Sequence, residues 1–89
     1  MIDGIVPYHR VNLKRDKLLW SLKLAKDLGI EGLQGPKVAW ITDKLGDAIP
    51  TRDMNGHFSG PRRVGYANRS MSGDAMRITE LGEEHLRSL

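Results

Sequence analysis

The chain has 89 residues and contains no cysteine. Disulfide bonds and thiolate metal sites are therefore excluded. The histidines, His9, His57 and His85, lack the spacing of metal ligands. No apolar run approaches the roughly 20 residues of a membrane-spanning helix, and the chain does not open with the pattern of a signal peptide. We expect a protein of the cytoplasm, without metal or other cofactor and without a membrane partner.

Aromatic residues are also few, with two Trp, two Tyr and one Phe. Proteins that hold single-stranded nucleic acid usually stack its bases on aromatic side chains, so this composition argues against that class. The sequence has no Gly-rich phosphate loop, no Ser-His-acid arrangement with a nucleophile elbow, and no cluster of carboxylates with histidine. We therefore expect that the protein is not an enzyme and has no catalytic residues.

The length fits a single domain with a modest core. Residues 1–11 have no helical periodicity and contain Gly4 and Pro7, which predicts an irregular N-terminal arm. This arm either contacts a phosphate backbone through Tyr8, His9 and Arg10 or, as we favour, packs on the domain. The domain itself is expected to comprise residues 12–89.

Charge is distributed unevenly although the net charge is only +3. Residues 50–78 carry five Arg against two Asp, and every basic residue after Lys44 is Arg. Arginine grips phosphate or guanine at two points, whereas lysine supplies a hydrated point charge. The pattern favours recognition of a nucleic acid by the second half of the chain.

The first half of the domain predicts two helices. Asn12 can cap the first helix and Gly29 can end it. Leu18, Leu22, Ala25, Leu24 and Leu28 form its apolar stripe, and Lys14, Lys17, Lys23 and Lys26 are expected outside. Residues 30–34 form at most one brief strand. Gly35 and Pro36 open the second helix and Gly46 ends it. Val38, Ile41 and Leu45 form the buried stripe of this helix.

Trp40 lies between Lys37 and Lys44 at helical spacing on another face of the second helix. Two interpretations remain open. A Trp flanked by lysines can form an interaction surface, but Trp is usually at least half buried, which favours a place in the core.

A third helix is predicted over residues 51–59, with Thr51 as its cap and residues 59–61 as its end. Met54 and Phe58, four residues apart, point inward. The outward face then carries Arg52, Gly56 and Ser59, with Asn55 and His57 at its borders. Small residues let a helix backbone approach a DNA groove, where Arg and Asn read base edges. An ordinary exposed helix face is the alternative.

A β-hairpin is predicted over residues 64–78, with strands at 64–69 and 75–78 and Gly73 in its loop. Arg69 and Arg77 flank that loop. Thr79 then caps a last helix, in which Leu81 and Leu86 are expected to face the core. The helix is rich in Glu and has no C-cap signal after Leu89, which suggests a domain of a longer protein or a helix completed by a second subunit.

The predicted fold class is therefore α+β, with a three-helix bundle, a small antiparallel hairpin and a C-terminal helix. The run Met76-Arg77-Ile78-Thr79-Glu80-Leu81-Gly82 to Leu86 resembles the segment that leaves the wing in winged helix-turn-helix regulators of the MarR and PadR type. Upstream, Gly65-Tyr66-Ala67-Asn68-Arg69 resembles the entry into the wing of the same families.

This resemblance, over roughly residues 35–88, implies sequence-specific binding of double-stranded DNA by a transcriptional regulator or by a module of a larger DNA-processing protein. The helix at 51–59 would enter the major groove and the 64–78 hairpin would lie on the backbone. The implied base contacts come from Arg52, Asn55, Gly56 and Ser59, with His57 beside them. The implied backbone contacts come from Arg62, Arg63, Arg69 and Arg77.

Two alternatives remain. A winged helix can serve as a protein-interaction module in a larger assembly, with Trp40, Trp20 and the acidic last helix as its contacts. The same last helix is a candidate surface for a homodimer or a partner protein. RNA is the other alternative. DNA binding requires the five arginines of residues 50–78 to gather on one face, whereas an interaction module does not.

Overall fold

The computed structural model describes residues 4–71 and 73–89, and over these residues it has four α-helices and one two-stranded antiparallel hairpin. In chain order the elements are η1 (Tyr8–Arg10), α1 (Lys14–Asp27), α2 (Gly35–Lys44), η2 (Thr51–Asp53), α3 (Met54–Arg63), β1 (Ala67–Arg69), β2 (Met76–Ile78) and α4 (Glu80–Arg87). The expected α+β class is confirmed, and the order of elements is compatible with a winged helix.

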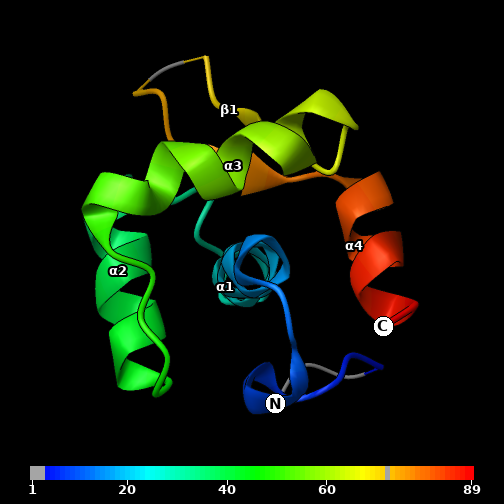
Figure 1. Cartoon of the computed structure of the whole chain (residues 1–89). Coiled ribbons are helices and arrows are strands. Elements are labelled where there is room, and N and C mark those ends of the chain that lie inside the picture. The colour runs from blue at the N-terminus through cyan, green and yellow to red at the C-terminus, as the bar shows by residue number, and fades with distance from the viewer. Residues whose placement is uncertain (1–3, 72) are drawn as a thin grey trace.

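Helix α1 runs through the middle of the molecule. Figure 1 shows it end-on, with α2, α3 and α4 on three sides and the N-terminal segment on the fourth. Every residue from 16 to 22 is buried, which a single apolar stripe does not predict. Lys17, expected outside, is only 7% exposed, whereas Leu28, expected in the core, is 68% exposed. Both expectations fail because neighbours surround the middle of α1 but not its C-terminal end.

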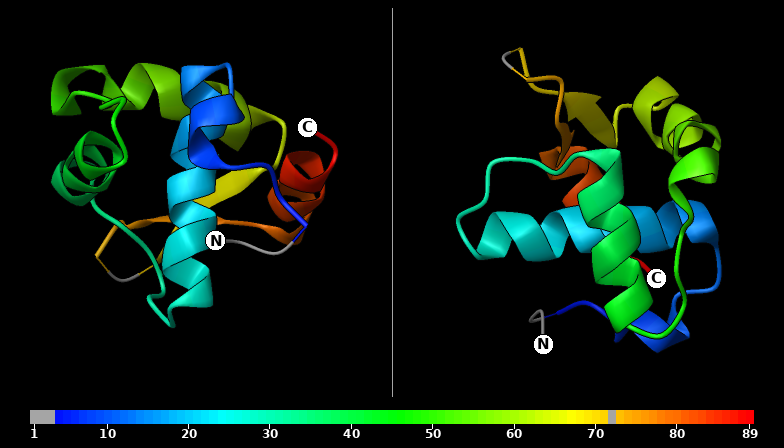
Figure 2. Two further views of the ribbon diagram at one scale, coloured as in Figure 1. Left: turned by 90° about the horizontal axis from the view of Figure 1, so that it is seen from below. Right: turned by 90° about the vertical axis from the view of Figure 1, so that its left-hand side faces the viewer.

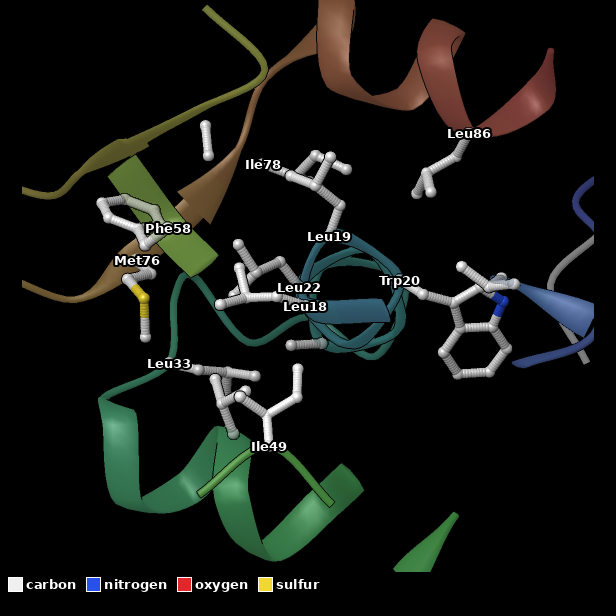
Figure 3. Close-up of a cluster of buried hydrophobic side chains, with 14 of the residues drawn as sticks. Leu18, Leu19, Trp20, Leu22, Leu33, Ile49, Phe58, Met76, Ile78 and Leu86 are labelled. Carbon is white, nitrogen blue, oxygen red and sulfur yellow. The ribbon is translucent and has the colours of Figure 1, made fainter. Parts of the chain in front are cut away.

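The core is built around the leucines of α1 (Figure 3). Leu18 and Leu22 lie near Leu33 and Ile49, while Leu19 points toward Ile78. All six of these side chains are less than a tenth exposed. Phe58 of α3 and Leu86 of α4 are also buried and join the same cluster. Because α1 supplies the centre, each outer element contributes only a few side chains.

The N-terminal segment is part of this core. Ile5, Tyr8 and Val11 are buried. The hydroxyl of Tyr8 donates to the carbonyl of Asp47 at 2.6 Å, and the indole N–H of Trp20 donates to the carbonyl of Val6 at 2.9 Å. Burial, with the Asp47 carboxylate nearby, raises the pKa of Tyr8 to about 12. The described residues of the arm are therefore packed on the domain.

Three predicted helix ends are wrong. Residue Leu13 holds the N-cap position of α1, and no side chain caps that helix, so Asn12 is not its cap. Thr51 also makes no cap bond, and residues 51–53 form a separate 3-10 turn. At the far end α3 continues through Pro61 to Arg63 instead of stopping near Ser59.

The extension of α3 has a local cause. Proline in a helix costs about 3 kcal/mol through its missing N–H, but Pro61 is buried, and that burial offsets part of the cost. The helix ends where Gly65 adopts φ 86°. The N–H groups of Gly65 and Tyr66 then bond the carbonyls of Arg62 and Pro61 at 3.2 and 2.8 Å, as in a glycine C-cap.

The hairpin is shorter than predicted because residues 64–66 belong to the helix end and the link. Ala67 pairs with Ile78, Asn68 with Arg77 and Arg69 with Met76. The predicted brief strand at 30–34 is reduced to one bridge, in which Leu33 and Met76 exchange backbone bonds of 2.9 and 2.8 Å. This bridge places the link between α1 and α2 beside β2.

Helix α4 begins with the predicted cap, since the Thr79 hydroxyl accepts from the N–H of Gly82 at 3.1 Å. Leu86 is buried as expected, but Leu81 is 49% exposed, so its predicted place in the core is wrong. Gly82 takes the inward position instead. A Cβ at Gly82 would lie 2.1 Å from the carbonyl oxygen of Tyr66, so only glycine lets α4 approach the strand entry this closely.

Carboxylates from outside α1 neutralise its lysines. Both Lys14 and Lys17 bond the carboxylate of Asp47, and these bonds lower the pKa of Asp47 to about 2. Lys23 and Lys26 bond Glu83 of α4 at 2.6 and 2.5 Å. Burial opposes ionisation of Glu83, yet these two bonds hold its pKa below the ordinary value. All four lysines of α1 are therefore paired with carboxylates within the fold.

Replacing Gly82 by Ala should lower the free energy of unfolding by about 2–3 kcal/mol, because the new methyl group forces α4 away from Tyr66. The matched control is Gly56→Ala, since Gly56 also lies in a helix but has open space around it. That change should raise stability by about 0.5–1 kcal/mol. Denaturant unfolding followed by circular dichroism measures both. Equal effects of the two changes would contradict the packing of α4 described above.

Stability should fall as pH drops from about 4 to 2, and Asp47 should account for part of this fall. The pKa of Asp47 is near 3.8 ordinarily and about 2 in the fold, so its contribution is complete above pH 4 and is lost as pH falls through 2. Asp47→Asn should therefore lower stability at pH 6 and flatten the acid limb. Asp43→Asn, at an exposed site without an ion pair among the described residues, should leave that limb unchanged.

Candidate nucleic-acid interface

The candidate interface is the outer face of α3, which crosses one side of the molecule over α1 (Figure 1). Its inner face is set by Met54, Phe58 and Pro61, spaced four and three residues apart and all buried. The opposite stripe is exposed, as predicted, and consists of Arg52, Asn55, Gly56, Ser59, Arg62 and Arg63. His57 is half-buried beside it. The extension of the helix to residue 63 adds the last two arginines to this stripe.

Arg69 of β1 joins the same surface. Its guanidinium lies 4.8 Å from the centroid of the Phe58 ring and donates to the Asn55 side-chain oxygen at 3.2 Å. It also donates to the carbonyl of Asp74 at 3.0 Å. Residue Arg69 thus links the hairpin to α3. With Asn55, Ser59, Arg62 and Arg63 it lines a hollow of about 440 Å³.

Arg77 lies elsewhere. It pairs with Asn68 in the hairpin register, whereas Arg69 pairs with Met76, so the two arginines project from opposite faces of the ribbon. Its Nε donates to the Asn68 side-chain oxygen at 3.3 Å, and its guanidinium lies 3.5 Å from the Glu31 carboxylate. The structure therefore brings Arg62, Arg63 and Arg69 together, with Arg52 on the same stripe, and leaves Arg77 out.

The charge balance of this face differs from that of α1. Among residues 4–71 and 73–89, Arg52, Arg62 and Arg63 form no ion pair with a carboxylate, whereas all four lysines of α1 do. Arg69 has only a long contact of 3.7 Å with exposed Asp74. Arg52 of η2 and Arg62 and Arg63 of α3 are therefore available to an external anion without breaking an internal pair.

A second hollow, of about 620 Å³, lies on the other side of α3. Its lining includes Gly56, His57 and Arg63, together with Asn12, which precedes α1, and Arg15 in the first turn of α1. Sequence reasoning did not include Arg15, which is exposed and forms no ion pair within the described residues. Its only sequence signal was its position between the predicted cap and the first apolar residues. The cationic surface thus extends from α3 onto the N-terminal end of α1.

No group of three or more His, Asp or Glu side chains in the described part of the chain is placed to hold a metal ion. None of the helices within residues 4–71 and 73–89 has the length and hydrophobicity that a membrane span requires.

Comparisons of the chain with protein-family models, with curated proteins and with solved structures gave no significant match. The geometry of the site therefore carries the functional argument.

The contact between Arg69 and Asn55 should be measurable as a coupling between hairpin and α3. In a double-mutant cycle of Arg69→Met and Asn55→Ala, the two effects on unfolding free energy should fail to add by about 0.5 kcal/mol, because the bond is exposed. Pairing Arg77→Met with Asn55→Ala provides the control, which should be additive within error. A cycle that is additive for Arg69 would show that the bond does not couple the two elements in solution.

Proposed function

We propose that this chain is a winged helix that binds double-stranded DNA, with α3 in the major groove. One observation carries the proposal. The exposed stripe along η2 and α3 holds three arginines without carboxylate partners among the described residues, while the four lysines of α1 are all paired. Arginines without an internal partner can bind phosphate without breaking an ion pair of the fold, which is what contact with a DNA backbone requires.

The winged-helix assignment rests on the arrangement of the hairpin. Its two strands lie on the same side of α1 as α3, in Figure 1 and in the right-hand view of Figure 2. The Leu33–Met76 bridge adds the link between α1 and α2 to the edge of β2, in the place of a third strand. Thr79 and Gly82, which carry the resemblance to MarR- and PadR-type regulators, then turn the chain into α4.

The residues of α3 suit a groove-reading helix. Gly56 and Ser59 at its centre leave the backbone open to close approach, and a Cβ at Gly56 would meet nothing within 4 Å. Arg52 and Asn55 lie toward the N-terminal end, where side chains of a recognition helix reach base edges. In this proposal they read bases, while Arg62 and Arg63 at the other end hold the phosphate backbone.

The hairpin has a narrower role in this proposal than the sequence suggested. Arg69 is the one arginine of the pair that faces the α3 side, so it is assigned the backbone contact. Arg77 is excluded from the DNA surface because it projects from the other face of the ribbon and contacts Glu31. The biological setting remains a transcriptional regulator or a module of a larger DNA-processing protein.

The alternative of a pure interaction module loses one of its three expected contacts, because Trp20 is only 5% exposed and bonds the N-terminal segment. In the acidic last helix, Glu83 faces the lysines of α1, while Glu80 and Glu84 are exposed. Trp40 remains as the one exposed tryptophan, and it does not overlap the α3 surface.

Binding to a labelled random-sequence DNA duplex tests the proposal, with fluorescence anisotropy measured at several salt concentrations. The protein should bind at low salt and weaken steeply as salt rises. The double change Arg62→Ala with Arg63→Ala should weaken binding about tenfold at low salt. It should also lower the magnitude of the salt slope by about 1.8, since each lost phosphate contact removes about 0.9.

The matched control is Arg10→Ala with Arg87→Ala, which removes the same charge from exposed sites away from α3. It should leave affinity and slope nearly unchanged, as should Arg77→Ala. If the control pair weakens binding as much as the α3 pair, attraction is due to net charge alone and the α3 assignment is wrong. Absence of binding at low salt would overturn the proposed function.

A further inference from the structure

A second surface lies away from α3, between the C-terminal end of α1 and α2. Here the side chains of Leu24, Leu28, Ile30, Trp40, Ile41 and Leu45 line a groove of about 780 Å³. Figure 2 (right) shows α2 crossing α1, with the end of α1 and the following link extending to one side. None of the residues that line this groove also lines the two hollows beside α3.

Three large apolar side chains of the groove are exposed, although the core does not require an apolar residue at their positions. Trp40 is 57% exposed and Leu28 is 68% exposed, and Ile30 lies beside them at 45%. Each is large, and all three line one hollow. Single exposed apolar residues are ordinary, but a contiguous apolar hollow with polar rims is typical of a binding site. The core of the protein is complete without these three residues.

The rims of the groove are cationic. The ammonium groups of Lys37 and Lys44 lie 5.3 and 5.6 Å from the centroid of the Trp40 ring. Within the described residues neither lysine is paired with a carboxylate, although exposed Asp43 is close in sequence. The residues that line the groove include no Asp or Glu. An occupant is therefore favoured if its apolar stripe is flanked by negative charge.

The spacing of the two lysines matches a helix. They are seven residues apart on α2, which corresponds to about 10.5 Å along the helix axis at 1.5 Å per residue. Two carboxylates seven residues apart on a second helix have the same separation. A helix laid along the groove can thus place one carboxylate near each lysine while its apolar stripe covers Leu28, Ile30 and Trp40.

We propose that this groove binds an acidic amphipathic helix of a partner protein. The site is independent of the proposed DNA surface, so a single chain can hold DNA on α3 and a partner on α2. The resulting role is that of an adaptor, which brings an acidic helical segment to a DNA site.

Two synthetic helical peptides test this proposal. Both carry Leu or Ile at positions i, i+3, i+4 and i+7, and the flanking positions seven apart are Glu in one peptide and Lys in the other. Binding to the whole chain is measured by anisotropy of the labelled peptide and by the emission of Trp40, with buried Trp20 as a constant background. The Glu peptide should bind at least about tenfold more tightly and shift the emission to shorter wavelength.

The charge change Lys37→Glu with Lys44→Glu should reverse the preference between the two peptides. Arg10→Glu with Arg87→Glu, an equal change of charge at exposed sites outside the groove, should leave the preference intact. Because the comparison between peptides uses the unaltered protein, it stands even if a variant folds poorly. Circular dichroism establishes that each variant is folded.

Three results would overturn the proposal. Equal affinity for both peptides, or no binding of either, would show that Lys37 and Lys44 do not favour an acidic helix. Self-association abolished by Lys37→Glu with Lys44→Glu, measured by sedimentation, would show that a second copy of this chain occupies the groove. Loss of DNA binding in the same variant, as large as that from Arg62→Ala with Arg63→Ala, would make the groove part of the DNA surface instead.

Discussion

Burial of the middle of α1, residues 16–22, on every side is the constraint on which the rest of the structure depends. A chain of 89 residues has few residues left to cover a central helix, so each covering element is short and buries little surface. The cover comes from three other helices, the hairpin and the N-terminal segment, all packed on α1. The charge of buried Lys17 is neutralised by an ion pair with Asp47. The same ion pair holds the turn before η2 against α1.

The sequence predicted well which segments form helices and strands, but it predicted poorly which of their side chains are buried by neighbouring elements. Gly29 and Gly46, which were predicted to end helices, have positive φ and lie just after α1 and α2. Gly65 lies just after α3 in the same conformation but was predicted to be in a strand. Local rules therefore found the helices but misplaced the end of α3. The burial of Trp20 and the exposure of Trp40 depend on which elements meet α1 and α2, and periodicity within one helix carries no information about that. The favoured interpretation of Trp40 as a core residue was wrong for this reason.

The candidate site gathers four of the five arginines that were expected on one face, leaves out Arg77 and adds Arg15, and both differences arise from tertiary structure. Its stripe on α3 follows directly from helical geometry, because Met54 and Phe58 fix which face is inward. Arg15 was missed because it comes from a different helix. Arg77 was included because both hairpin arms look alike in sequence, whereas the observed register puts Asn68, and not Arg69, opposite it.

In the proposed role, the glycine cap at residue 65 limits the length of DNA that α3 could contact. It closes a helix of 10 residues, which is about 15 Å long at 1.5 Å per residue. At 3.4 Å per base pair, such a helix faces about four base pairs. A given sequence of four base pairs recurs roughly every 256 base pairs by chance. It is therefore far too frequent to define a unique binding site among the 10⁶ or more competing sites of a genome. In the proposed role, one copy of this domain therefore recognises too few base pairs to select a unique site. Sequence selectivity then has to come from a second copy or from another DNA-binding protein bound beside it.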